Sequence, residues 1–314
     1  MKKFMLITLA ALIQFQAVAG EKVNKTLEVS QQPYVKVEHV NGKADIKSWD
    51  QNQVKVVGSL GDRTDKFIFE RDGNEVEIKV KIKKSMGFNW GSDDGDDLTI
   101  WVPAGSRINY NAVNADVKVA EVSGGAEIET VNGSIAVRQL AWRIRLDSVN
   151  GNIDAKDLAG DVKIETVNGN IDSQSQQGKT DHYGSVNGNI KVKSDSESLQ
   201  VETVNGGVEL TLAKVKRLNL ETVNGDIEAS MTLKNNGDVN ASAVSGNIEL
   251  RFQPEVSARF EIESHGGRIV NDLTADQVQK EKHGPNSWLE FSANGGDGNV
   301  EVSTVSGKIK LARH

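Results

Sequence analysis

Val167-Asn168-Gly169-Asn170-Ile171 is one of seven near-copies of a pentapeptide that recur along the middle of this chain. The copies share valine, then asparagine or serine, then glycine, and end in isoleucine or valine. Their second positions advance by 18, 18, 19, 18, 19 and 21 residues. A period this short and regular is typical of a stack of similar coils and not of an ordinary globular domain. The copies begin at Val131, Val149, Val167, Val186, Val204, Val223 and Val244.

Each repeat contains two short segments with the alternating pattern of β-strands. Before the third corner, Val162, Ile164 and Thr166 point one way, whereas Lys163 and Glu165 point the other way. Two strands and two glycine-containing corners describe one turn of a flattened coil. The sequence therefore predicts an all-β fold, a single-stranded β-solenoid with about 18–20 residues per turn. Equivalent residues of successive turns would stack at about 4.8 Å.

The chain divides into four predicted parts. Residues 1–19 form a signal peptide, with Lys2 and Lys3, an apolar stretch over residues 4–13 and an Ala-x-Ala pattern before Gly20. Residues 20–110 form an N-terminal β region and cap, and residues 111–270 form the regular repeats. Residues 271–314 form an inserted loop, with a short helix expected at 275–280, and a C-terminal cap turn. Terminal coils must seal the core and the exposed strand edge, so departures from the repeat are expected there.

The signal peptide predicts export, and the composition limits the class of protein. The chain has no cysteine, which excludes disulfides, thiolate metal sites and a lipid-modified cysteine after the signal. No segment after the signal is apolar enough to cross a bilayer, so we expect a periplasmic, secreted or cell-surface protein. Net charge is −7, and it becomes −9 when Lys2 and Lys3 leave with the signal. An acidic chain without a basic cluster is a poor candidate for nucleic-acid binding.

Three segments make this chain resemble a known family. They are Val40-Asn41-Gly42 with Ser48-Trp49-Asp50 and Val54-Lys55-Val56, the run over residues 98–106, and the repeated pentapeptide. The chain thereby resembles, over roughly residues 27–312, the bacterial β-strand-repeat family of unknown function whose members are described as candidate adhesins. That family is related to the toastrack envelope domains. The resemblance implies the fold and an adhesin-like role but brings no catalytic residues, and this chain departs from it at residues 271–287 and 92–97.

Polar side chains at the corners have a structural interpretation. Asparagine and glycine suit tight corners, and stacked asparagines can bond one another along the column. The residue before each repeat valine is threonine or serine, which predicts a ladder of hydroxyl groups at the bend. That column contains Thr130, Ser148, Thr166, Ser185, Thr203 and Thr222.

Two acidic columns are more informative. The first lies two positions before the repeat valine and contains Glu129, Asp147, Glu165, Gly184, Glu202 and Glu221. The second lies just past the corner and contains Asp154, Asp172, Lys191, Glu209, Glu228 and Glu249. Stacked like charges are mildly destabilising, by up to about 1 kcal/mol per pair. The columns form either a solvated, solubilising face or a face that binds divalent cations or a basic partner.

Trp142 is unusual because its register places it at a corner that Gly160 occupies one turn later. Such a side chain tends to point outward. With Arg143 and Arg145 beside it, Trp142 would stack on a sugar or seat a partner; the alternative is packing against a neighbouring cap. Together with Glu129, Asp147, Glu165, Glu202 and Glu221, these three residues form the predicted partner-binding surface.

The loop at residues 91–97 is a candidate calcium site. Asp93, Asp94, Asp96 and Asp97 place four carboxylates in five residues, and Ca²⁺ prefers many oxygen ligands. The loop lacks the spacing of an EF-hand, so a flexible polar turn is the alternative. No other cofactor is expected.

The favoured function is a non-enzymatic envelope module, an adhesin or scaffold that binds an envelope protein or a glycan. An alternative is a polysaccharide-acting β-helix enzyme, whose site would lie where the columns are interrupted, at His182, Tyr183, Gly184 and Lys191, with Glu165 nearby. No nucleophile, base and acid set is recognised, and no catalytic residue is assigned. A third possibility is end-to-end self-association, because solenoid edges template further strands.

Overall fold

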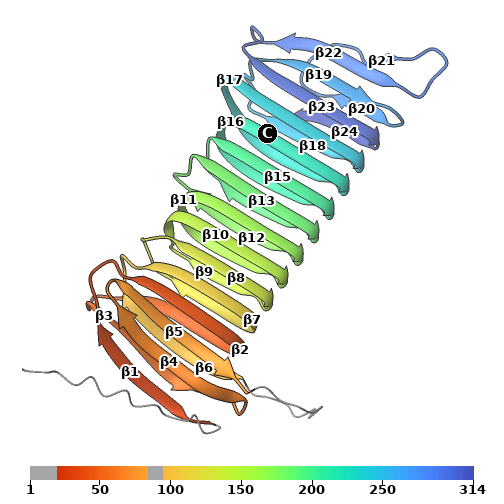
Figure 1. The fold of residues 1–314 in the computed structure, drawn as a ribbon. Coiled ribbons are helices and arrows are strands. Elements are labelled where there is room, and N and C mark those ends of the chain that lie inside the picture. The colour runs from red at the N-terminus through yellow and green to blue at the C-terminus, as the bar shows by residue number, and fades with distance from the viewer. Residues whose placement is uncertain (1–19, 84–94) are drawn as a thin grey trace, which may run out of the picture.

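The computed structural model describes residues 20–83 and 95–314, and all regular structure in these residues is β-strand (Figure 1). The N-terminal strands are β1 (Lys22–Glu28), β2 (Tyr34–Trp49), β3 (Gln53–Ser59), β4 (Thr64–Asp72), β5 (Glu75–Ile82), β6 (Asp96–Pro103) and β7 (Arg107–Ala120). The middle strands are β8 (Ala126–Asn132), β9 (Ile135–Arg138), β10 (Ala141–Asn150), β11 (Ile153–Asn168), β12 (Ile171–Gln176), β13 (Thr180–Asn187), β14 (Ile190–Ser194), β15 (Ser198–Asn205), β16 (Val208–Asn224) and β17 (Ile227–Ser245). The C-terminal strands are β18 (Ile248–Phe252), β19 (Ala258–Ser264), β20 (Arg268–Asn271), β21 (Gln279–Lys280), β22 (Ser287–Ala293), β23 (Gly298–Ser306) and β24 (Lys308–Arg313).

Strand β11 shows how one turn is built. Its first half follows one corner and pairs in parallel with β9 and β12, whereas its second half leads into the next corner and pairs with β10 and β13. Asn150, Asn168 and Asn187 are in register at successive corners, which gives turns of 18 and 19 residues. The predicted all-β, single-stranded solenoid is confirmed.

Two faces result from this winding. The first face contains the strands that lead into the corner, which are the first halves of β2 and β7, then β8, β10, the second half of β11, β13, β15, the second halves of β16 and β17, β23 and β19. The second face contains the strands that follow the corner. Alternate residues of both faces, such as Ile144 and Leu146 or Ile153 and Ala155, are buried in a narrow core between them.

The predicted asparagine ladder is present at the corner. The side-chain amide of each asparagine donates to the side-chain oxygen of the asparagine one turn earlier, as Asn168 does to Asn150 at 2.8 Å. Seven such bonds of 2.7–3.0 Å run from Asn41 to Asn224.

The predicted column of hydroxyl groups is present at the bend, in register from turn to turn. The hydroxyl groups lie beneath the corner, where the nearest acceptor is a main-chain carbonyl of the preceding corner. Thr166 donates to the Gly151 carbonyl oxygen at 3.2 Å, and Ser148 donates to that of Gly133 at 3.3 Å. Thr130 and Ser185 donate in the same way, so four hydroxyls of the column tie a turn to the backbone of the previous one, whereas Thr203 Oγ1 and Thr222 Oγ1 have no hydrogen-bond partner among the described residues.

The N-terminal end is closed by antiparallel strands. Strand β2 pairs in parallel with β7 on one side and with β5 and β6 on the other. Beyond these lie β4, which is antiparallel to β5, and then β3 and β1, which form an antiparallel series on β6. These outer strands replace the parallel edge that a regular turn would leave exposed.

The predicted inserted loop is mostly irregular, but the C-terminal end differs from the predicted cap turn. Strands β23 and β24 do not end the stack; β23 lies between β17 and β19, and β24 lies between β18 and β20 (Figure 1). The end is formed by β22, antiparallel to β19, and by the short β21. The prediction of a short helix at 275–280 was wrong, because residues 279–280 form strand β21. An antiparallel hairpin covers the edge more completely than another parallel turn would.

Within residues 20–83 and 95–314, no helix has the length and apolarity needed to span a membrane.

Candidate functional site

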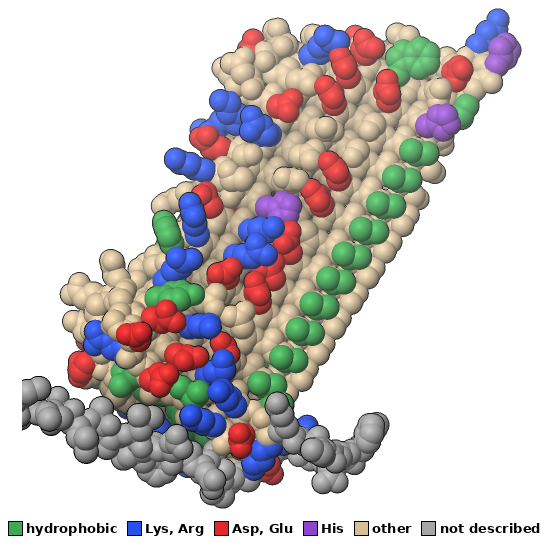
Figure 2. Space-filling view, viewed as in Figure 1, with side chains coloured by type: hydrophobic (Ala, Val, Ile, Leu, Met, Phe, Trp, Pro, Cys, Tyr) green, Lys and Arg blue, Asp and Glu red, His purple; other side chains and the backbone are tan. Residues whose placement is uncertain are grey.

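The valine of each pentapeptide forms an exposed ridge along the corner. Figure 2 shows it as a straight row of hydrophobic side chains beside a band of acidic ones. These valines are 39–51% exposed, although most other apolar residues of the same strands are buried. The valine ridge contains Val113, Val131, Val149, Val167, Val186, Val204, Val223, Val244 and Val305.

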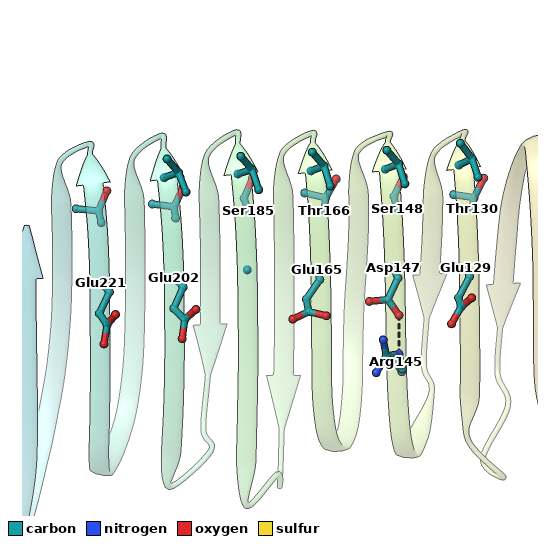
Figure 3. A pocket seen from close by; sticks show the side chains of 18 of the residues that line it. Glu129, Thr130, Arg145, Asp147, Ser148, Glu165, Thr166, Ser185, Glu202 and Glu221 are labelled. Atoms are coloured by element: carbon teal, nitrogen blue, oxygen red, sulfur yellow. Dashed lines mark hydrogen bonds and ion pairs between the residues drawn. The ribbon is translucent and has the colours of Figure 1, made fainter.

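A groove of about 950 Å³ runs beside the valine ridge on the first face. Its floor is the buried hydroxyl column, from Thr130 to Thr222, and its second wall is the first acidic column. The alternation of side chains along each strand explains the cross-section of the groove, because glutamate and valine point outward while the threonine between them points inward. Figure 3 shows Glu129, Asp147, Glu165, Glu202 and Glu221 projecting on the same side from strands of the first face, with the strand of Ser185 between those of Glu165 and Glu202.

The register of the first acidic column is confirmed. Asp147 pairs with Glu129 on one side and Glu165 on the other, and Gly184 separates Glu165 from Glu202. Beyond Glu221 the column continues as Ser242 and Ser303. The strands of the first face therefore bring five of the predicted partner-binding residues into one groove, with Arg145 as a sixth lining residue.

Cations neutralise only part of this column. Arg145 lies 2.7 Å from Asp147, and Glu165 lies 3.0 Å from Lys163 and 3.1 Å from His182. Over residues 20–83 and 95–314, Glu129, Glu202 and Glu221 form no ion pair with a lysine, arginine or histidine; amides of Gln200 and Asn219 donate to the last two.

The second acidic column is paired more completely. Asp172 lies 2.6 Å from Lys156, Glu209 lies 2.8 Å from Lys191, and Glu249 lies 3.1 Å from Lys310. Arg251 contacts Glu228 and Glu249. Excess negative charge is therefore concentrated in the groove on the first face.

Adjacent carboxyl groups in the groove titrate differently. Burial raises the pKa of Asp147, and the charge of Glu165 one turn away raises it further, against the opposing effect of Arg145. Burial also acts to raise the pKa of Glu165, but Lys163 and His182 donate to that carboxylate and bring its pKa below the usual value. A cationic ligand would favour the charged form of Asp147.

Trp142 and Arg143 lie outside the groove. They line a separate hollow toward the start of β10, together with Arg107 from β7, and Arg145 borders both hollows. Trp142 pairs in register with Gly160, as predicted, and its side chain is 54% exposed. The eight predicted surface residues thus form two neighbouring sites on one face.

The residues at the interrupted turn do not form one cluster. His182 faces outward beside Glu165, whereas Tyr183 is fully buried in the core. Gly184 lines the groove, and Lys191 lies on the second face paired with Glu209. The site proposed for a polysaccharide-acting enzyme is therefore divided among the core and two faces.

The candidate calcium loop is described only in part. Asp93 and Asp94 lie outside the described residues. Asp96 is buried, where its Oδ1 accepts hydrogen bonds from the Gly61 amide and the Thr64 hydroxyl, both at 2.8 Å, and its Oδ2 lies 3.2 Å from His39. Asp97 lies 3.0 Å from Lys43. Among the residues with assigned structure, no group of three or more His, Asp or Glu residues has the arrangement of a metal site. Calcium binding stays a prediction.

Two features were not predicted. The exposed valine ridge follows from the same alternation that places Glu165 outward, since Val167 is two residues further on. Asp181 is fully buried in register with Val162 and Leu199, and its Oδ2 accepts hydrogen bonds from Ser175 at 2.6 Å and Ser194 at 2.7 Å. The inward position of Tyr183, two residues later, was the signal for that burial.

Comparisons with known proteins identify a family for most of this chain. The family model described as Toastrack DUF4097 matches residues 34–312. Among solved structures, a candidate adhesin from Bacteroides fragilis is 13% identical, with 93% of this chain and 97% of that chain covered and a TM-score of 0.41. A candidate lipid-binding protein from Parabacteroides distasonis is 13% identical, with coverage of 94% and 98% and a TM-score of 0.41. A candidate cell adhesion protein from Clostridium sporogenes is 11% identical, with coverage of 94% and 100% and a TM-score of 0.22. A search of the curated proteins finds no significant match.

Proposed function

This chain belongs to the Toastrack DUF4097 family, and on that premise we propose that it is an exported, non-enzymatic binding module of the bacterial envelope, of the adhesin or scaffold type. Its ligand is an extended cationic segment of a partner protein held in the groove of the first face. The observation that carries the proposal is the groove itself, with an apolar ridge on one side and under-neutralised carboxylates on the other.

The chemistry of the two walls supports this class of partner. The ridge offers aliphatic contact along its length, and Glu129, Glu202 and Glu221 offer carboxylates that no cation of the described chain occupies. A partner segment that places an aliphatic side chain on the ridge and a lysine or arginine against the acidic wall would make favourable contacts with both walls of the groove. A second copy of this chain fits poorly, because its own groove carries the same charge.

The dimensions support an extended segment. Seven valines line the groove, from Val131 to Val244. Six steps of about 4.8 Å give a length of about 29 Å, which is about nine residues of extended chain. The rigid stack of turns holds these groups in place before binding, so little ordering of the protein is required.

The other two hypotheses have less support. The residues of the candidate enzyme site lie on different faces and in the core. End-to-end assembly would need an open parallel edge, whereas antiparallel strands β4 and β22 lie outside the parallel turns. Export is proposed on the signal-like residues 1–19.

Defined peptides test the proposal on the wild-type protein. We expect a peptide of about ten residues with alternating lysine and valine to bind in isothermal titration calorimetry, and raised ionic strength to weaken it. Alternating lysine and serine should bind less well, and alternating glutamate and valine should not bind. Equal binding of all three peptides, or none by the lysine-valine peptide, would contradict the proposal.

A further inference from the structure

Trp142 has a backbone conformation that the fold does not require of a tryptophan. Its φ is +81°, a value that bulky residues rarely adopt. The next turn places Gly160 at this corner with φ +131°. The indole lies over Gly125, where an added β-carbon would be 2.8 Å from Trp142 Cε3. A strained residue that glycine replaces one turn later points to a role in binding.

Two arginines flank the exposed indole. The guanidinium carbon of Arg143 lies 5.5 Å from the centre of the Trp142 ring, and that of Arg107 lies 5.9 Å away. Within the described chain, neither arginine forms an ion pair with a carboxylate. This contrasts with Arg145, which is bound to Asp147. Both guanidinium groups lack an ion-pair partner within the described chain, and they can therefore bind an anion from outside the molecule.

The rest of the hollow is lined by both hydrogen-bond donors and hydrogen-bond acceptors. Thr180 and His182 line it with Asp161 and Glu127. Asp161 Oδ1 accepts from the main-chain amides of Lys179 at 3.2 Å and Thr180 at 3.3 Å, and Asn109 donates to Glu127 at 3.1 Å. Neither carboxylate forms an ion pair with Arg107 or Arg143 in the described chain, so the arginine side of the hollow stays cationic although the whole chain has net charge −7.

We propose that Trp142, Arg143 and Arg107 form a second binding site, which takes an anionic saccharide. The apolar C–H face of a pyranose ring contacts the exposed indole, and the carboxylate or sulfate of the sugar binds one or both guanidinium groups. Thr180, His182 and Asp161 lie where they can bond sugar hydroxyl groups. An exposed aromatic ring with free cations and mixed donors and acceptors matches a molecule that presents an apolar face, an anion and many hydroxyl groups together.

The test uses soluble oligosaccharides and a variant that should not unfold. Trp142→Gly removes the indole and relieves the positive φ, so its melting temperature should equal or exceed that of the wild type. We expect hexagalacturonate, or a sulfated oligosaccharide of equal length, to bind the wild-type protein in calorimetry. Trp142→Gly and Arg143→Gln should each weaken that binding by about tenfold or more, and the methyl ester of hexagalacturonate should bind as weakly.

Arg217→Gln is the matched control, because Arg217 is exposed on the first face near the start of its strand segment, several turns away. It should leave saccharide binding unchanged. The proposal is overturned if neither oligosaccharide binds, if Trp142→Gly binds as tightly as the wild type, or if Arg217→Gln weakens binding as much as Arg143→Gln. The variant Glu202→Gln should bind the saccharide normally, so failure of the groove proposal and failure of this one are distinguishable.

Discussion

Gly206 stacks on Gly188 of the preceding turn so closely that a β-carbon at position 206 would lie 2.1 Å from the Gly188 carbonyl oxygen. The same approach recurs at the other V-N-G corners, such as Gly169 on Gly151 and Gly225 on Gly206. Glycine is needed there because the turns rise by only one strand spacing, and any side chain would push two backbones apart.

Gly206→Ala is therefore expected to lower the free energy of unfolding by about 2 kcal/mol or more. The neighbouring Gly207→Ala is the control, because its β-carbon would meet nothing closer than Asn189 Oδ1 at 3.6 Å. Gly207→Ala should change stability by less than about 1 kcal/mol, in either direction. Urea unfolding of the two variants measures the difference, and equal destabilisation would show that the corner is not tightly stacked.

The regular turns could be predicted from sequence because everything that defines them is local. The V-N-G corner, the alternation before it and the period place Glu165 outward, Ile164 inward and Trp142 opposite Gly160, and each placement is confirmed. The exposure of the valine ridge could have been predicted from the same alternation.

The ends could not be predicted, because their contacts join residues far apart in the chain. His39 Nδ1 lies 2.9 Å from the Tyr110 hydroxyl across 71 positions, and His39 also contacts Asp96. Likewise, nothing local in β23 indicates that it inserts between β17 and β19. The hydroxyl column was placed correctly, but its hydrogen-bond partners depended on where the neighbouring backbone lay.

Asp181 should make stability depend on pH. Burial raises its pKa above the usual 3.8, although hydroxyl groups including Ser175 and Ser194 donate to the carboxylate and lower it in part. An acid with a raised pKa stabilises the fold most below its unfolded pKa, and this contribution is lost as the pH rises through the folded value.

Asp181→Asn should therefore gain stability relative to the wild type, by roughly 1–2 kcal/mol, as the pH rises from about 4 to 7. Exposed Asp195 provides the control, since Asp195→Asn should track the wild type at each pH. Urea unfolding at several pH values measures both variants. Parallel stability curves for wild type and Asp181→Asn would show that Asp181 carries no such penalty.

Asp96 should have the opposite dependence on pH. Burial acts to raise its pKa, but His39, the Gly61 amide and Thr64 interact with the carboxylate and bring its pKa below 3.8. This stabilisation is present above the unfolded pKa and is lost as the pH falls through the folded value.

Asp96→Asn should cost about 3 kcal/mol at pH 7, because it leaves buried partners of the carboxylate unsatisfied. Asp97→Asn, which removes only an exposed pair with Lys43, should cost less than about 1 kcal/mol. Tryptophan fluorescence during urea unfolding can report the unfolding of the N-terminal end, since the ring centres of Trp49 and Trp101 lie 6.3 Å apart there. Similar losses in both variants would contradict the structural role assigned to Asp96.

The groove is tested most directly by neutralising two carboxylates on one face or the other and measuring the affinity of each variant for the alternating lysine-valine peptide. Glu202→Gln with Glu221→Gln removes two unpaired carboxylates of the groove, whereas Glu209→Gln with Glu228→Gln removes two paired ones from the second face. Net charge changes equally. At low ionic strength we predict that the groove variant binds the peptide about tenfold more weakly and that the second-face variant binds it like the wild type. Equal weakening in both variants would mean that the peptide senses only total charge, and the groove would not be the binding site.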